Sequence, residues 1–226
     1  MLILHQDQKF VIVAKPPGIS VHRQKRFPNE KPVLQRVRDH FEKKVWPVHR
    51  LDRQASGCLM FAFESSQVQF YSEALAQSTK SYLALVRGCF SSSELIEVNT
   101  PIKSKRGYQD AHSSVQCLGR STEPRCSLLK VHPHTGRHHQ VRRHVRDLNH
   151  PILHDGDHGD SRVNRWWREN MNLRRLGLHA LRIEFHTLNL TVECPLFEDH
   201  HSVLKQLPFW SEVINLEPIL QSKPIL

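Results

Sequence analysis

Short stretches in which apolar residues alternate with polar ones, or run together, are the main pattern along this chain. Such stretches are typical of strands that bury one face or both faces. Strands are therefore predicted at residues 10–15, 46–51, 58–63, 80–87 and 125–132, and as an antiparallel pair at 181–185 and 188–192. On the fourth strand, Tyr82, Ala84 and Val86 share one face, while Leu83 and Leu85 occupy the other.

Apolar residues at helical spacing predict four helices. They contain Val33, Leu34, Val37 and Phe41; Val68, Tyr71, Ala74 and Leu75; Val141, Val145 and Leu148; and Val203, Leu204 and Leu207. Ser66 is the expected cap of the second helix, and Thr135-Gly136 is the expected start of the third. Strands joined mostly by hairpins, with a few helices against them, predict an α+β fold. The chain of 226 residues suits one sizeable core, so a single domain over 1–226 is expected.

The charge balance narrows the choice of partner. The chain has 32 lysine and arginine residues against 22 aspartate and glutamate residues, a formal charge of +10, and a pI near 9.7. Such an excess of positive charge favours polyanions, nucleic acid first. An anionic membrane surface is the alternative, but no stretch combines a basic face with a long apolar one.

Cysteine usage and hydropathy indicate the compartment. The five cysteines are odd in number and include no Cys-x-x-Cys pair, which argues against a disulfide framework and a cysteine zinc site. No apolar run approaches the ~18 residues of a membrane-spanning helix, and the first apolar stretch is too short for a signal sequence. A soluble protein of the reducing cytoplasm is expected.

The segment HRLDRQASG (49–57) places Asp52 between Arg50 and Arg53, directly before a turn of small residues. Nearby positive charges favour the ionised form of a carboxylate. Asp52 could be a nucleophile, a general base or the counter-ion of a surface ion pair. The glycine-closed turn allows the backbone to approach a ligand closely, which favours a functional site.

The segment HPHTGRHHQVRRH (132–144) contains five histidines, three arginines and no acid. Zinc binding by His134 and His138 is disfavoured, because the pair straddles the expected helix start and lacks an acidic or cysteine ligand nearby. A phosphate site at the helix start fits better, with Thr135 as the cap. The arginines expected around it are Arg137, Arg142, Arg143 and Arg146. A solvated basic helix face explains the same pattern equally well.

Three further segments are candidates for function. Tyr82 lies on a strand, where a tyrosine most often belongs to the core. The stretch KPPGISVH (15–22) joins a strand to a turn. The stretch HDGDHGD (154–160) contains a His-Asp pair of the kind found in metal phosphohydrolases, but no second such segment completes a two-metal site.

Taken together and in order, these motifs resemble the motif series of the RluA-type pseudouridine synthases. They are KPPGISVH (15–22), HRLDRQASG (49–57), KSYLALVRG (80–88), HPHTGRHHQVRRH (132–144), HPILHDGDHGD (150–160) and LHALRIEF (178–185). The resemblance covers almost the whole chain, and HRLD with a following SG, plus TGR-x-HQ-x-R, is a highly specific combination. It implies a mostly antiparallel mixed central sheet flanked by helices. With no small RNA-binding domain ahead of these motifs, the chain looks most like the TruC branch, which isomerises the uridine at position 65 of certain tRNAs.

The resemblance also implies roles for individual residues. Asp52 corresponds to the catalytic aspartate, which attacks the target nucleoside so that the base detaches from C1′, turns and rejoins through C5. Tyr82 matches a tyrosine that packs on the base and is a candidate acceptor of a ribose proton. Arg142 matches the arginine that pairs with the aspartate, and Arg50 the arginine thought to fill the gap left by the extruded nucleotide. Further RNA contacts are expected from Lys15, His22, His49, Arg53, Arg137, Gln140 and Arg143.

No metal and no cofactor are expected, because an isomerisation needs no redox change or group transfer and the chain lacks a glycine-rich nucleotide loop. The implied partner is RNA, tRNA first, with no obligate protein partner and a monomeric state. Ala55 and His158 depart from the family pattern, which usually has threonine and often tyrosine there. Three alternatives stay open: a family member acting on rRNA, an inactive RNA-binding protein of this fold, and a metal-dependent phosphohydrolase built on the histidines.

Overall fold

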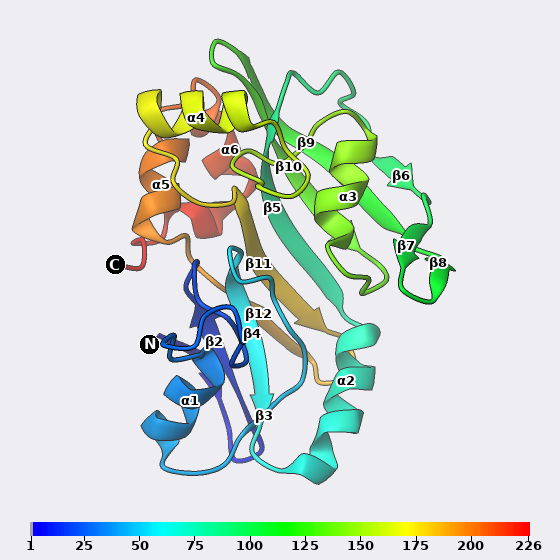
Figure 1. The fold of residues 1–226 in the computed structure, drawn as a ribbon, viewed down its shortest axis with the longest axis vertical. Coiled ribbons are helices and arrows are strands. Elements are labelled where there is room, and N and C mark those ends of the chain that lie inside the picture. Colours follow the sequence, from blue (N-terminus) through cyan, green and yellow to red (C-terminus); the bar gives the residue numbers. More distant parts are fainter. Residues whose placement is uncertain (1) are drawn as a thin grey trace.

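The computed structural model describes residues 2–226, which are built around one large twisted sheet (Figure 1). The sheet contains ten strands in the order β1-β2-β4-β11-β5-β10-β9-β6, with β3 beside β4 and β12 beside β11, and β7 and β8 form a separate hairpin. The strands are β1 (Ile3–Gln6), β2 (Phe10–Lys15), β3 (Trp46–Pro47), β4 (Ser56–Ala62), β5 (Thr79–Arg87), β6 (Ile96–Val98), β7 (Ile102–Ser104), β8 (Gly107–Gln109), β9 (Ser113–Thr122), β10 (Arg125–Pro133), β11 (Leu178–Phe185) and β12 (Leu190–Glu193).

Helices cover both faces of this sheet. They are α1 (Val33–Phe41), α2 (Val68–Ala76), α3 (Gln140–Asp147), α4 (Ser161–Asn170), α5 (Glu198–Leu204) and α6 (Trp210–Leu216), with 3₁₀ turns at Ser65–Gln67 and Pro218–Gln221. Within residues 2–226, every strand ladder is antiparallel except that between β4 and β11. The predicted α+β fold with a mixed, mostly antiparallel sheet is therefore confirmed. No helix in the described part of the chain has both the length and the apolar character to cross a membrane.

Strand β11 joins the two halves of the sheet, because it lies between β4 and β5. Its parallel ladder with β4 places His179 opposite Ser56 and Ala180 opposite Gly57. Gly57 has a φ of +118°, and a Cβ atom there would lie 2.2 Å from the carbonyl oxygen of Ala180. Only glycine fits this close approach, which holds the turn after Asp52 directly against β11.

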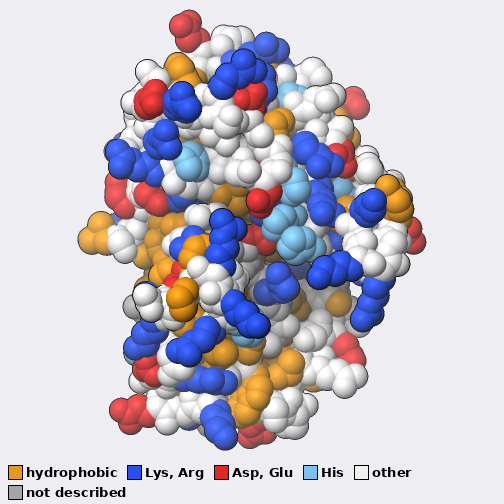
Figure 2. All heavy atoms as spheres, in the orientation of Figure 1, with side chains coloured by type: hydrophobic (Ala, Val, Ile, Leu, Met, Phe, Trp, Pro, Cys, Tyr) orange, Lys and Arg blue, Asp and Glu red, His pale blue; other side chains and the backbone are white. Residues whose placement is uncertain are grey.

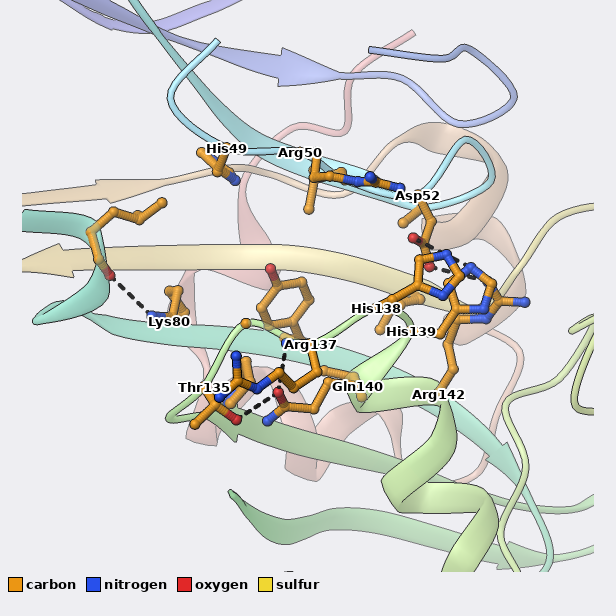
Figure 3. A pocket seen from close by; sticks show the side chains of 18 of the residues that line it. His49, Arg50, Asp52, Lys80, Thr135, Arg137, His138, His139, Gln140 and Arg142 are labelled. Atoms are coloured by element: carbon orange, nitrogen blue, oxygen red, sulfur yellow. Dashed lines mark hydrogen bonds and ion pairs between the residues drawn. The ribbon is translucent and has the colours of Figure 1, made fainter. Parts of the chain in front are cut away.

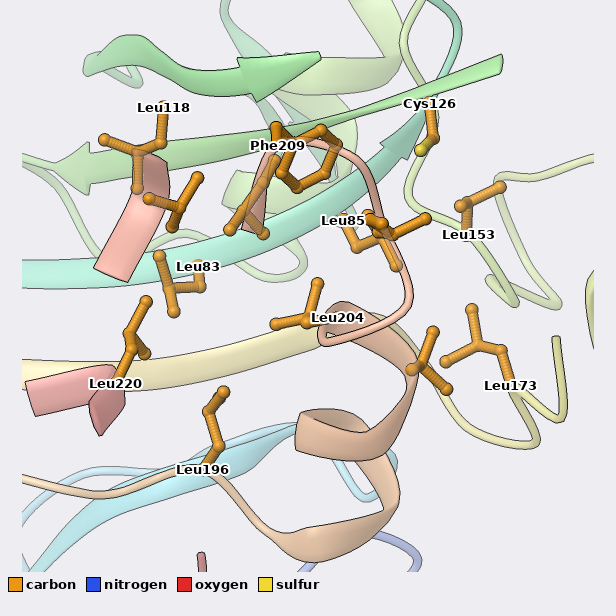
Figure 4. Close-up of a cluster of buried hydrophobic side chains, with 14 of the residues drawn as sticks. Leu83, Leu85, Leu118, Cys126, Leu153, Leu173, Leu196, Leu204, Phe209 and Leu220 are labelled. Carbon is orange, nitrogen blue, oxygen red and sulfur yellow. The ribbon is translucent and has the colours of Figure 1, made fainter. Parts of the chain in front are cut away.

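Alternate residues of β5 and β10 bury opposite faces of the sheet, as the period-2 pattern predicts. Leu83 and Leu85 belong to a cluster with Leu204 of α5 and Phe209, the residue before α6 (Figure 4). On the other face, Ala84, Val86, Leu129 and Val131 share a cluster with Val141 and Val145 of α3. Burying each such large apolar side chain contributes about 1.5–3 kcal/mol. The core therefore fixes α3 against the sheet, and α3 carries part of the site.

The predicted strands at 10–15, 58–63, 80–87, 125–132, 181–185 and 188–192 all exist within three residues of the expected bounds. The strand expected at 46–51 is shorter and covers only Trp46–Pro47. Ser66 does not cap α2, because it lies inside the 3₁₀ turn and its hydroxyl donates to Glu64 at 3.4 Å. The closing helix exists as α5, although it ends before Leu207, and α4 and α6 were not predicted.

The largest correction concerns the third helix. It begins at Gln140, not at Thr135-Gly136. His139, which precedes it, has a left-handed φ of 56°, so residues 134–139 form a loop instead of a first helical turn. The Thr135 hydroxyl does not cap the helix either. It donates to Oε1 of Gln140 at 2.7 Å, and the amide of Gln140 thereby holds the loop.

His200 of α5 makes stability depend on pH. Its side chain is fully buried, neither ring nitrogen has a hydrogen-bond partner within residues 2–226, and burial lowers its pKa well below the ordinary value. The unfolded chain therefore takes up a proton as the pH falls through about 6.5, while the folded chain does not. This one group should reduce the free energy of unfolding by about 1.4 kcal/mol per pH unit below that point.

We expect His200→Leu to remove this dependence. Chemical denaturation at intervals from pH 7 to pH 5 should show a shallower loss of stability in the variant than in the wild type. The difference in slope should correspond to about one proton. Parallel curves for the two proteins would contradict the assignment.

Candidate active site

Asp52 lies on the loop between β3 and β4, and its partner comes from a distant part of the chain (Figure 3). Oδ2 of Asp52 accepts a hydrogen bond from Nη1 of Arg142 at 3.1 Å. Oδ1 lies 3.7 Å from Nε2 of His139. The flanking arginines do not pair with Asp52. Arg53 instead donates to Glu30 at 2.9 Å, so the alternative in which Asp52 is only the counter-ion of a sequence neighbour is not what the structure shows.

Arg142 is buried and held by three carboxylates. It donates from Nε and Nη2 to both oxygens of Asp155, at 2.7 and 2.6 Å, and from Nη2 to Asp157 at 2.7 Å. Burial opposes its charge, but the hydrogen bonds and charge of Asp155, then those of Asp157 and Asp52, raise its pKa above the ordinary value. Arg142 is a permanent, rigid cation at the site. It is not available for the phosphate site expected at the helix start.

Lys15 holds the loop that carries Asp52 through hydrogen bonds to backbone carbonyl groups. Nζ of Lys15 donates to the carbonyl oxygens of Pro16 at 2.8 Å, Arg53 at 3.1 Å and Ala55 at 2.7 Å. The side chain is fully buried, and burial lowers its pKa to about 7. The expectation that Lys15 contacts RNA is therefore wrong: Lys15 holds the backbone on both sides of Gln54, and no ligand can reach it.

The small-residue turn, which departs from the family pattern at Ala55, is held by backbone contacts and by Ser56. Ala55 is buried in the apolar cluster that includes Leu178. The Ser56 hydroxyl lies 2.7 Å from Nδ1 of His179 and accepts a hydrogen bond from Arg175 at 2.5 Å. These contacts position Asp52 without the threonine hydroxyl that most family members have.

A cavity of about 480 Å³ opens beside Asp52. Its apolar wall includes Val48, Leu75 and Leu178, and Tyr82 also faces it. Within residues 2–226, the Tyr82 hydroxyl has no hydrogen-bond partner. Burial, and then the charge of Asp52, raises its pKa above the ordinary value. The cavity therefore combines an apolar wall, a neutral phenol and the Asp52 carboxylate, which suits a base with its ribose.

Several residues with expected RNA contacts line the same cavity: His49, Arg50, Arg137 and Gln140. Nε2 of His49 accepts a hydrogen bond from the Met60 amide at 3.1 Å, and burial lowers the pKa of His49 to about 4, so this ring is neutral. Gln140 accepts from the Arg137 amide at 2.9 Å and donates to Ser113 at 2.9 Å. Because its amide is fully engaged, Gln140 holds the loop. Its contact with RNA stays a prediction.

Three other expected RNA contacts lie outside this cavity. Arg53 lines a neighbouring hollow. Arg143 donates to the carbonyl oxygen of Lys103 at 2.8 Å, and His22 is exposed. The contacts of these three residues with RNA stay predictions.

The histidine-rich segment does not bring His134 and His138 together as metal ligands. In residues 2–226, the group of three potential ligands with donor atoms within 4.8 Å of one another is Glu97, His112 and His134. Within this group, Nε2 of His112 lies 2.6 Å from Oε2 of Glu97. Nε2 of His134 lies 2.8 Å from the hydroxyl of Ser114, which is outside the group. His138 does not belong to this group.

The sequence did not reveal Asp155, Asp157 or His139 as members of the site. The two aspartates were considered only as part of a metal motif. A usable indication existed, since an arginine that a helix buries needs a carboxylate partner, and no acid lies within four residues of Arg142 in the sequence. His139 gave no such indication. Its place beside Asp52 follows from its left-handed backbone, and Nδ1 lies 3.1 Å from Nε2 of His158.

Comparison with known proteins decides the family. The sequence model of the RNA pseudouridylate synthase family matches residues 9–147, which include Asp52, Tyr82 and Arg142. The chain belongs to this family. This match confirms the RluA-type resemblance seen in the motifs. The enzymes of this family are isomerases, which agrees with the predicted enzyme class.

Relatives of this RNA pseudouridylate synthase extend the match to nearly the full chain. The tRNA pseudouridine synthase C of Haemophilus influenzae is 34% identical over 237 residues, covering 93% of this chain and 99% of that protein. The protein of the same name from Salmonella typhi is 36% identical over 231 residues, covering 90% and 88%.

Solved structures agree on the fold. Human RNA Pseudouridylate Synthase Domain Containing 4 superposes with a TM-score of 0.67 at 21% identity, covering 99% of this chain and 94% of that one. Human RNA Pseudouridylate Synthase Domain Containing 1 gives a TM-score of 0.65 at 23% identity, covering 85% and 81%. The architecture around the site is therefore that of an RNA pseudouridylate synthase.

Proposed function

We propose that this chain isomerises a specific uridine of tRNA to pseudouridine, with Asp52 as the nucleophile. The observation that carries the proposal is the Asp52–Arg142 pair at the edge of a cavity that Tyr82 also lines. The relatives named tRNA pseudouridine synthase C favour tRNA as the substrate. The likeness of the motifs to the TruC branch favours position 65.

The geometry suits the chemistry that this reaction requires. Cleavage of the bond between N1 of the base and C1′ of the ribose builds positive character on the sugar, which the Asp52 carboxylate stabilises and then bonds as the base leaves. The base turns, and its C5 bonds to C1′ as the bond from Asp52 to C1′ breaks. The proton of C5 then leaves and N1 gains a proton. Arg142 keeps the carboxylate oriented because Asp155 fixes the guanidinium from behind. A uridine in a stem must leave the stack first, at a cost of a few kcal/mol, which phosphate contacts offset.

The test follows the C5 proton. The protein is mixed with tRNA that carries tritium at uridine C5, and label released to water is measured with and without EDTA. Release that survives EDTA is expected. Label that is retained although tRNA binds would identify an inactive RNA-binding protein. Release that EDTA abolishes and zinc or manganese restores would identify a metal-dependent enzyme.

The choice between tRNA and rRNA needs a separate measurement. Pseudouridines are mapped in total RNA from cells with and without the gene for this chain. A single tRNA position that depends on the gene is expected, and an rRNA position instead would show that the substrate assignment is wrong.

Tyr82→Phe separates two roles of the tyrosine. If the phenol accepts a ribose proton, the variant should bind tRNA as the wild type does, while tritium release slows by about 100-fold or more. Tyr71→Phe is the matched control, since Tyr71 is buried on α2 against Phe10 and lies outside the cavity. A Tyr82→Phe variant with the wild-type rate would leave the ring only a packing role.

A further inference from the structure

A second hollow, of about 470 Å³, meets the first cavity at Asp52. The two share part of their lining, and the shared residues are Arg50, Leu51, Asp52, His138, His139 and Arg142. The second hollow adds residues from four separate segments: Gln24, Arg26 and Phe27; Arg53 and Gln54; His154, Gly156 and Asp157; and Arg174 and Leu176. Asp52 therefore stands where two differently built spaces meet.

The two spaces differ in chemistry. The first cavity has an apolar wall and the ring of Tyr82. The second is lined by five arginines: Arg26, Arg50, Arg53, Arg142 and Arg174. Its acids are Asp52 and Asp157, and both already pair with Arg142. Lys and Arg side chains gather around the middle of this face of the molecule, with histidines between them (Figure 2).

Three of these five arginines form no ion pair with any residue that the structure describes. Arg53 pairs with Glu30, and Arg142 with its aspartates. By contrast, Arg26, Arg50 and Arg174 are exposed and form no ion pair with any residue of 2–226. Arg174 donates only to the side chain of Asn172, at 2.8 Å. Burial lowers the pKa values of His138, His139 and His154, so these rings are neutral at pH 7 and the arginines supply the positive charge.

The segment around Phe27, which forms one wall of the second hollow, contacts the loop that carries Asp52. The guanidinium of Arg53 lies 3.9 Å from the ring centroid of Phe27, and that of Arg26 lies 5.6 Å from it. Glu30, which pairs with Arg53, also accepts a hydrogen bond from the Ser20 amide at 2.7 Å. The segment around Phe27 is thus held at a fixed place relative to Asp52, and Arg26 is presented to the hollow by structure that is already ordered.

We propose that the second hollow binds the backbone phosphates of the nucleotides next to the target uridine, with Arg26 and Arg174 as phosphate contacts. The RNA strand then passes over Asp52, its phosphates in the arginine-lined hollow and the extruded base in the apolar cavity. Guanidinium groups without acidic partners are the side chains best suited to phosphate oxygens. Such contacts fix the register of the strand without reading its sequence. The proposal depends on the proposed function only in taking RNA as the ligand.

The test measures tRNA affinity over a range of salt concentrations for Arg26→Gln, Arg174→Gln and the double variant. Each single change should weaken binding about fivefold to tenfold, and reduce the slope of log Kd against log[salt] by about 0.7–0.9. Arg125→Gln is the matched control. Arg125 is exposed at the opposite end of β10 from Pro133, which lines the first cavity. Variants that bind no worse than this control, with the wild-type slope, would overturn the proposal.

A second measurement places the contact on the strand. Once the target uridine is mapped, a tRNA stem is prepared with one uncharged methylphosphonate next to that uridine. This RNA should bind the wild type less tightly than the unmodified stem does, while the double variant should bind both almost equally. An equal loss of affinity in both proteins would show that these arginines contact no such phosphate.

The outcomes also separate this proposal from the proposed function. If the wild type releases no tritium but binding depends on Arg26 and Arg174, the phosphate site stands and the isomerase assignment fails. If the wild type releases tritium and the arginine variants match Arg125→Gln in KM and salt slope, the isomerase assignment stands and the phosphate site fails. With both correct, KM should rise about fivefold to tenfold in each variant with little change in kcat.

Discussion

Asp52→Asn is expected to lower tritium release from labelled tRNA by about 10⁴-fold or more, because an amide cannot serve as the nucleophile. The change keeps the shape of the side chain. Arg142 keeps its contacts with Asp155 and Asp157, so the site should remain folded. Affinity for tRNA should stay the same or rise slightly, since one negative charge disappears beside the RNA backbone.

The control for this variant is Asp147→Asn. Asp147 also pairs with an arginine of α3, Arg146, at 2.5 Å, but lines neither hollow. Its loss should leave the rate within about twofold, as for most surface substitutions. An Asp52→Asn enzyme that keeps more than about one hundredth of the wild-type rate would remove Asp52 from the nucleophile's role, because a lost nucleophile costs far more than that.

Gly57→Ala is expected to destabilise the protein by about 3 kcal/mol or more, from backbone strain together with overpacking. The new methyl group would lie 2.2 Å from the Ala180 carbonyl oxygen, and φ at this residue is +118°. Relief requires β4 to move away from β11, which breaks the parallel ladder that joins the halves of the sheet. Denaturant unfolding measures the loss.

Gly107→Ala isolates the contribution of the steric clash. Gly107 also has a positive φ, +103°, but a Cβ atom there meets nothing within 4 Å. It should therefore cost only the conformational term, of the order of 1 kcal/mol. Equal losses in the two variants would mean that the contact with Ala180 is unimportant. Tritium release by any folded Gly57→Ala protein should also fall, because the same movement displaces Asp52.

The strands could be predicted from the sequence because their side chains alternate between two buried faces. The cores around Leu83 and Leu85 and around Ala84 and Val86 follow directly from that period. The start of α3 could not be predicted in this way. Thr135-Gly136 is typical of a helix start, but the left-handed backbone of His139 and the side-chain contacts of Gln140 keep the preceding residues in a loop.

The sequence identified most residues of the candidate site, but it did not predict which of them contact one another. Asp52, Tyr82 and Arg142 were identified and do meet at one cavity. Which charged residues form ion pairs depends on their positions in space. Arg53 follows Asp52 in the sequence but pairs with Glu30. The same limitation applies to Lys15, whose basic side chain suggested RNA but whose ammonium group is buried under the loop. Charge in a sequence shows which residues are cationic and leaves open whether a ligand can reach them.

The place of β11 has a consequence for biosynthesis. A ribosome makes β4 and β5 early, yet the strand that belongs between them emerges only after α4. Until then the nascent polypeptide holds two unjoined half-sheets with open edges, and such edges favour aggregation. Premature termination after residue 142 but before residue 178 would therefore release fragments that contain Asp52, Tyr82 and Arg142 but cannot bring them together.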